Sequence, residues 1–191
     1  MYENNDIDIT GWDLRKTLRL LRKSNASLLE RIQSPILYKS DSKFLTEINL
    51  LAQSQYSRKA TIHHYLSMAA KFFEEIKELE QYKLKKFFYL LRSAIVCKWI
   101  LEKDVMPPIE FKKMLDGLSF DQRLLKRIDE LIVLKAKSSE SYLHTGESEI
   151  FEFIRRCINA ANLERTALPS SEGNSRDLDL FFIKTLSIND H

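Results

Sequence analysis

The sequence predicts a mostly α-helical protein, a helical bundle with one short strand near its N-terminus. Three observations lead to this prediction. The 191-residue chain has only four Gly and four Pro, fewer turn-forming residues than sheet-rich folds use. Its apolar residues recur mainly at spacings of three and four, which is typical of amphipathic helices. A convincing period of two, typical of a half-buried strand, occurs only at residues 7–10 (Ile-Asp-Ile-Thr).

Composition and charge narrow the class of protein. Hydrophobic residues make up 44% and charged residues 30% of the chain, so a core can form and disorder is not expected. The net charge of +3 is too small to indicate nucleic-acid binding without further signals. Cys97 and Cys157 lie in apolar helical patterns without metal-ligand spacing, which predicts buried, reduced thiols. No apolar run approaches the ~20 residues of a membrane span, and the acidic, polar N-terminus does not resemble a targeting peptide. We therefore expect a cytoplasmic protein with no membrane partner.

The first helix is predicted from Asp13, its N-cap, to Lys23, directly after the strand and a turn at Gly11. Its apolar face consists of Leu14, Leu18 and Leu21. A stripe beside that face consists of Arg15, Arg19 and Arg22. No acidic residue follows Asp13 in this helix, so its cations lack i,i+4 partners. Guanidinium groups match phosphate oxygens, so we predict that the arginine stripe binds a nucleotide or RNA. An ordinary solvated helix face is the alternative.

The rest of the chain is divided by its periodicity into further helices and two loops. A short helix is expected through residues 28–32, and others over 42–52, 60–79, 82–102, 109–115, 120–137, 147–163 and 177–186. The predicted organisation is a strand remnant (1–12), a helical domain (13–163), a flexible loop (164–176) and a C-terminal helix that docks on the bundle (177–191).

The helix over 82–102 is apolar on most sides, which predicts a central place in the bundle. Its remaining polar stripe is Lys85, Tyr89 and Arg92. An ammonium, an aromatic ring and a guanidinium on one face suit the phosphates and base of a nucleotide or RNA. The alternative is a buried tyrosine whose two charged neighbours reach out to solvent.

Several blocks resemble a known family. They are GWDLRKTLRLLRKSNASLLERIQSPILY (11–38), HHYLSMAAK (63–71), LKKFFYLLRSAIVCKWI (84–100), PPIEF (107–111) and LDLFFIKTL (178–186). Together they resemble the YcgL-type nucleotidyltransferases of the DNA polymerase β superfamily, which are associated with an RNA repair pathway. The resemblance covers nearly the whole chain, and its most specific parts are GWDLRK and LKKFFYLLR.

The resemblance implies metal-dependent nucleotidyl transfer from a nucleoside triphosphate to an acceptor, with Mg²⁺ as cofactor. Members of the superfamily carry a Gly-Ser pair followed by Asp-x-Asp, which hold the triphosphate and two of three metal-binding carboxylates. None of the four glycines here precedes a serine. Asp8 matches the third carboxylate, which implies a catalytic and metal-binding role only together with carboxylates that this chain lacks. Asp6 and Asp8 are not read as the Asp-x-Asp pair, because only five residues precede Asp6.

The resemblance thus implies a chain equivalent to the C-terminal part of a nucleotidyltransferase, inactive when alone. Its expected partners are a nucleoside triphosphate or RNA, a separate N-terminal catalytic chain, and a second copy paired through the exposed strand. A non-catalytic RNA-binding or partner-binding module is an alternative. A third is a HEPN-like ribonuclease, because Arg58 to His63 fits the loose R-x4-6-H pattern. His63 and His64 as a metal pair are disfavoured, since adjacent helical residues point about 100° apart.

Overall fold

The computed structural model describes residues 11–169 and 173–189, and these form nine α-helices and a two-stranded sheet. The mostly helical fold predicted from composition and periodicity is confirmed. The predicted strand at residues 7–10, with Asp8, lies outside the described residues. Within the described part of the chain, no helix combines the length and the apolar character needed to cross a membrane.

Three short helices follow the N-terminus: α1 (Leu14–Arg22), α2 (Ala26–Ile32) and α3 (Ser42–Ser54). Each begins after a side chain that accepts a hydrogen bond from a backbone N–H three residues later. These N-caps are Asp13, Asn25 and Asp41. Such caps satisfy an N–H group that the first turn leaves unpaired, and each stabilises a helix by about 1 kcal/mol. The cap predicted at Asp13 is confirmed.

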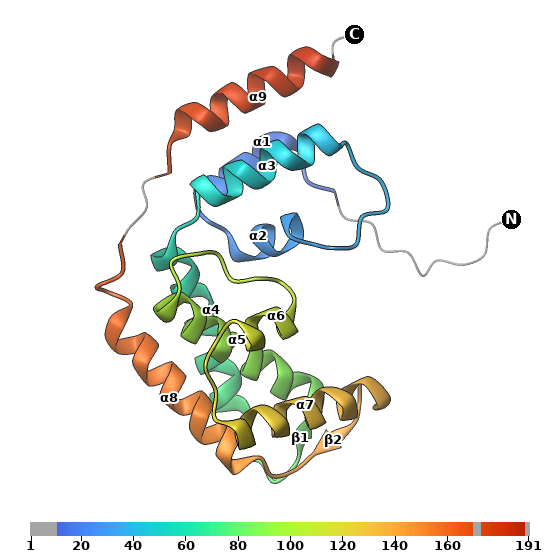
Figure 1. Cartoon of the computed structure of the whole chain (residues 1–191), viewed down its shortest axis with the longest axis vertical. Helices are drawn as coiled ribbons and strands as arrows, with labels where there is room; N and C mark the ends of the chain where they lie inside the picture. The colour runs from blue at the N-terminus through green and yellow to red at the C-terminus, as the bar shows by residue number, and fades with distance from the viewer. Residues whose placement is uncertain (1–10, 170–172, 190–191) are drawn as a thin grey trace, which may run out of the picture.

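The centre of the molecule is the pair α4 (Arg58–Ile76) and α5 (Leu84–Glu102). Around them lie α6 (Phe111–Asp116), α7 (Gln122–Lys137) and α8 (Ser148–Glu164), as Figure 1 shows. Helix α5 buries side chains on most of its circumference, including Phe87, Leu90 and Ile95, which are fully buried. Its apolar sequence therefore indicated its central position correctly.

The helix predicted to begin at Tyr82 begins instead at Leu84, and that part of the prediction is wrong. Residues Tyr82–Lys83 form β1, which pairs antiparallel with β2 (Leu143–His144). The Tyr82 hydroxyl donates to the Gly146 carbonyl (2.7 Å), and the Leu84 N–H donates to the Tyr142 carbonyl (3.1 Å). Contacts with the distant segment between α7 and α8 thus fix the extended backbone, and local periodicity carries no information about them.

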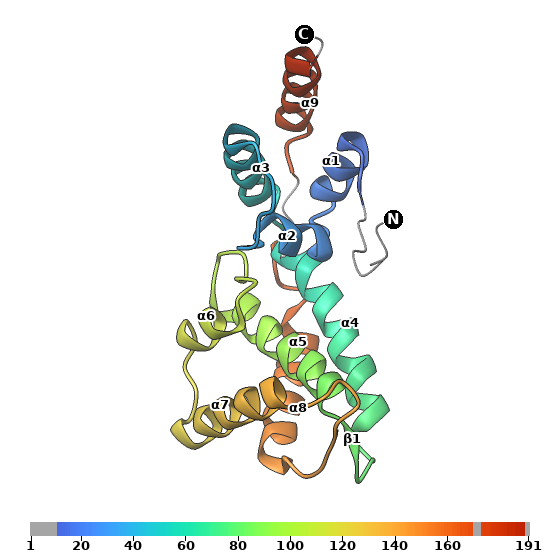
Figure 2. The same ribbon diagram turned by 90° about the vertical axis from the view of Figure 1, so that its right-hand side faces the viewer.

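The described helices share two separate apolar clusters. The larger lies among α4 to α8, which we call the central bundle. The smaller lies among α1, α2, α3 and α9 (Ser175–Asn189), which we call the outer group. Figure 2 shows the outer group above the central bundle. Helix α9 follows α8 in the sequence but packs against α1 and α3, far from the end of the bundle where α8 begins.

Polar contacts join the two groups. The Glu30 carboxylate accepts a hydrogen bond from the Tyr65 hydroxyl (2.8 Å) and pairs with Arg92 (3.1 Å). Burial, with the nearby Glu30 charge, raises the pKa of Tyr65 far above its usual value, so the hydroxyl stays protonated and donates. Within the outer group, the Gln55 side-chain amide at the end of α3 donates to the Asn174 carbonyl (3.1 Å). These contacts hold α2 and the segment before α9 in place.

Candidate phosphate-binding groove

A groove of about 300 Å³ lies between α1 and α9. Three arginines line one side, and α9 supplies a hydroxyl, a carboxylate and an aromatic ring. The lining residues are Arg15, Leu18, Arg19, Arg22, Ser175, Leu178, Asp179 and Phe182. The two helices run in opposite directions in Figure 1, where α1 lies behind α3 and α9 is red. The predicted arginine stripe therefore faces a concave site rather than a flat surface.

The apolar spacing of α1 positions this stripe. Leu18 and Leu21 are buried in the outer group, which orients the helix and leaves the adjacent arginine face at the groove. On the other wall, Leu178 and Phe181 are buried and hold α9 in place. The Phe181 ring lies 5.4 Å from that of Phe44 on α3. Burial of these side chains removes apolar surface from water, and this fixes the separation of the walls.

The three arginines of the groove have no ion pair with any residue in ranges 11–169 and 173–189. Arg15 lies over the Phe182 ring, 5.6 Å from its centroid, at a distance that permits cation–π attraction. Asp179 lines the same groove without pairing with an arginine there. The guanidinium donors of this site are thus available to a ligand.

The second predicted set, Lys85, Tyr89 and Arg92, lies on α5 and does not line this groove. Lys85 pairs with Glu140 (2.5 Å) and Arg92 pairs with Glu30 (3.1 Å). Tyr89 is 46% exposed, and its ring stacks on Phe72 (5.9 Å between centroids). The aromatic ring remains accessible, whereas both cations already have carboxylate partners.

The structure gives Arg58 a role other than catalysis. Its guanidinium donates to the carbonyls of Ile100 and Leu101 at the end of α5 and pairs with Asp104 (3.3 Å). His63 is exposed on the same helix, about 140° around the axis from Arg58. The two residues of the ribonuclease pattern thus point to different places.

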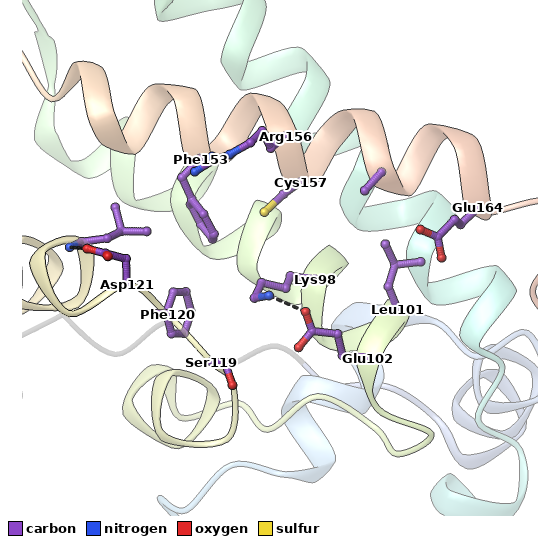
Figure 3. Close-up of a pocket in the computed structure, with 12 residues that line it drawn as sticks. Lys98, Leu101, Glu102, Ser119, Phe120, Asp121, Phe153, Arg156, Cys157 and Glu164 are labelled. Carbon is purple, nitrogen blue, oxygen red and sulfur yellow. Dashed lines mark hydrogen bonds and ion pairs between the residues drawn. The ribbon is translucent and has the colours of Figure 1, made fainter.

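A larger cavity of about 470 Å³ opens between α5, α7 and α8. In Figure 3, its lining mixes the ion pair Lys98–Glu102 with aromatic side chains and the Cys157 thiol. Burial raises the pKa of Cys157 to about 12, so the thiol is protonated and a poor nucleophile. Cys97 and Cys157 are both free and buried, which confirms the prediction of unpaired thiols. Its charged lining consists of two cations and three carboxylates, whereas the α1/α9 groove has three arginines and one carboxylate, so this cavity is the weaker phosphate site.

No group of three or more His, Cys, Asp or Glu in the described part of the chain could hold a metal ion. Asp8, which the family resemblance implied as a ligand, lies outside those residues. The described side chains therefore do not form an Mg²⁺ site, and no metal-dependent step is assigned to them.

Sequence reasoning did not include the α9 residues Ser175, Asp179 and Phe182 in the site. Their spacings of four and three place them on one helix face, but the same spacing occurs on many solvated helices. Only the packing of α9 against α1, residues distant in the sequence, shows that this face meets the arginines. The site can therefore be recognised only from the contact between α1 and α9 in the tertiary structure.

Comparison with known proteins identifies relatives of the chain. The model of a family described as "RlaP: RNA repair pathway DNA polymerase beta family" matches residues 1–184. The uncharacterized protein YcgL of Bacillus subtilis (strain 168) is 32% identical over 148 residues. That match covers 78% of this chain and 57% of the relative, so the chain matches little more than half of that protein's length. No solved structure matches.

Proposed function

The chain belongs to the RNA repair pathway DNA polymerase β family, and we propose that it serves nucleotidyl transfer to RNA by holding phosphates of the acceptor strand in the α1/α9 groove. The observation that supports this role is the unpaired arginine stripe, Arg15, Arg19 and Arg22, along one wall of the groove. Family membership supports the reaction class, and the groove supports the binding role.

The chemistry of the groove suits a phosphate. Each guanidinium presents several N–H donors in a planar fork that matches phosphate oxygens, and charge-assisted hydrogen bonds are stronger than neutral ones. The volume of about 300 Å³ is at the lower end of the range for small-molecule sites, roughly 300–1,000 Å³. That space suits one nucleotide unit of a single strand, not a duplex.

Under this proposal, catalysis needs carboxylates beyond the described residues. Asp8 would supply one and other carboxylates the rest, and the bound Mg²⁺ would polarise the reacting phosphate. The alternative function, a non-catalytic RNA-binding module, uses the same groove. Incubation of the chain with Mg²⁺, labelled nucleoside triphosphates and RNA tests for catalysis, and any transfer would exclude the non-catalytic alternative. Transfer by this chain alone would also refute the expectation that it is inactive without a further catalytic chain.

The binding role is tested with the triple variant R15A/R19A/R22A and a fluorescent single-stranded RNA in an anisotropy titration. We expect affinity to fall on the order of a hundredfold, since each lost charge-assisted bond contributes about 1 kcal/mol or more. The log–log salt dependence should also become shallower by roughly 2, because three contacts to single-stranded nucleic acid contribute about 0.7 each.

A matched control is R123A/K126A/K137A, which removes the same charge from exposed positions of α7. It should lose little affinity. Equal losses in both variants would mean that net charge, and not the groove, attracts RNA. Urea unfolding of both variants should give nearly wild-type stability, because the groove arginines have no ion-pair partners in the described chain.

A further inference from the structure

We propose that the α1/α9 groove selects ribonucleotides, with Asp179 accepting a hydrogen bond from the 2′-hydroxyl while the arginines hold the phosphate. This inference rests on the proposed function and adds a specificity-determining residue to it. It starts from one feature that phosphate binding does not explain, which is a carboxylate in a groove whose other charged residues are all cations.

Asp179 has no structural role that accounts for it. It is exposed and lines the groove, and it makes no ion pair or hydrogen bond with another described residue. The neighbouring acid of the same helix, Asp177, differs because it accepts a hydrogen bond from the Asn174 side chain (3.1 Å). An ionised carboxylate only accepts hydrogen bonds. It would repel a bare phosphate, so a favourable ligand must present a donor at this point.

The two walls of the groove form an ordered series along its length. On α9, Ser175, Asp179 and Phe182 follow at spacings of four and three. On α1, which runs the opposite way, the order is Arg22, Arg19, Arg15. The Arg15–Phe182 contact fixes one end of this alignment. From Ser175 to Phe182 the helix rises roughly 10 Å, at about 1.5 Å per residue.

This series matches the parts of one nucleotide. The Ser175 end combines Arg22 with the positive end of the α9 dipole, which favours the phosphate. Asp179 is one turn further, where the ribose would lie. Phe182, with the Arg15 guanidinium over its ring, offers a surface on which a base can stack. The 2′-hydroxyl distinguishes RNA from DNA at a protein site, and deoxyribose lacks it.

The test uses three fluorescent oligoadenylates of equal length: RNA, DNA and 2′-O-methyl RNA. They carry the same bases and phosphates. The wild-type chain should bind the RNA roughly tenfold tighter than the DNA, the discrimination that a lost hydrogen bond to a charged group gives. The 2′-O-methyl strand keeps the oxygen but cannot donate, so it should bind as weakly as the DNA. If it binds as tightly as RNA, Asp179 does not accept from the 2′-hydroxyl.

The variant Asp179→Ala should reduce the RNA-to-DNA affinity ratio to about one. Asp129→Ala on α7, with the same change in charge, should leave the ratio unchanged. A ratio that survives Asp179→Ala overturns this inference while leaving the proposed function intact, provided that R15A/R19A/R22A still weakens RNA binding on the order of a hundredfold. If the wild-type chain binds none of the strands, the proposed function itself fails.

A last experiment distinguishes an RNA strand from a free nucleotide as the ligand of the groove. ATP and dATP are added as competitors to the RNA complex. Weak competition by both supports the strand as the ligand. Strong competition by ATP but not by dATP supports the same ribose recognition with a free nucleotide as its source. Equal, strong competition by both would contradict recognition of the 2′-hydroxyl.

Discussion

Two arginines of the central bundle and the three groove arginines of the outer group are used differently. In the bundle, Arg58 bonds to carbonyls at the end of α5, and Arg127 pairs with Glu130 and Glu147. In the outer group, the arginines of α1 line a groove without ion-pair partners in the described chain. The guanidinium donors of Arg58 and Arg127 are therefore occupied within the fold, whereas those of the groove arginines remain available to a ligand.

The apolar cores of the two regions also differ, because the core of the bundle is the more extensive one. The bundle surrounds α5 with buried side chains from its neighbouring helices, whereas the outer group has a smaller core, to which α9 contributes the buried residues Leu178 and Phe181. Other apolar side chains of α9 remain largely exposed: Leu180, Ile183 and Leu186. We infer that the bundle is the scaffold and the outer group the binding element.

The largest expected effect comes from Phe87→Ala in the bundle. Phe87 is fully buried, and its ring lies 5.4 Å from those of both Tyr82 and Phe151. Truncation should lower the free energy of unfolding by about 3–5 kcal/mol, through lost burial and a cavity that surrounding helices cannot fill. Phe181→Ala in the outer group should cost less, because α9 can shift. Urea titrations of the two variants measure this, and an equal or larger loss at Phe181 would contradict the assigned scaffold role.

A smaller loss is expected for Arg58→Ala. The last carbonyls of a helix have no partner within the helix, and Arg58 supplies donors to those of Ile100 and Leu101. We expect the free energy of unfolding to fall by about 2 kcal/mol, since charged donors contribute roughly 1.5–3 kcal/mol. Lys59→Ala, at the next position, is the control and should be nearly neutral.

If RNA cleavage by the wild-type chain were found and His63→Ala abolished it, the ribonuclease alternative would regain support.

The smallest expected effect is a pH dependence at Glu147. Burial would raise the pKa of this carboxyl group, but hydrogen bonds from Arg127 and His144 more than offset it, so its pKa lies below the usual value. The ionised form is thus favoured by folding. Its stabilisation is full above the unfolded-state pKa of about 4.3 and disappears as pH falls through the lower folded-state pKa.

This prediction is measured by comparing wild type with Glu147→Gln, which keeps the side-chain shape. The wild type should be more stable by about 1 kcal/mol at neutral pH, and the difference should shrink as pH is lowered below 4. A difference that does not change with pH would show that the charge of Glu147 contributes nothing to the bundle.

Much of the fold could be predicted from the sequence because the patterns that specify its helices are local in the sequence. Apolar spacing located the helices, the short polar side chain of Asp13 marked a helix start, and the apolar circumference of α5 indicated its central place. The arginine stripe was also readable, since residues three and four apart share a helix face. Family membership followed from whole blocks of sequence.

Contacts between distant residues could not be read in this way. The pairing of β1 with β2 displaced the start of α5, Arg58 proved to bind the end of another helix, and Glu30 took Arg92 as its partner. The groove itself exists because burial of Leu178 and Phe181 brings α9 against α1. The sequence alone set which face of α1 carries the arginines. Only long-range packing put Asp179 opposite them, because local periodicity does not specify which helix faces meet.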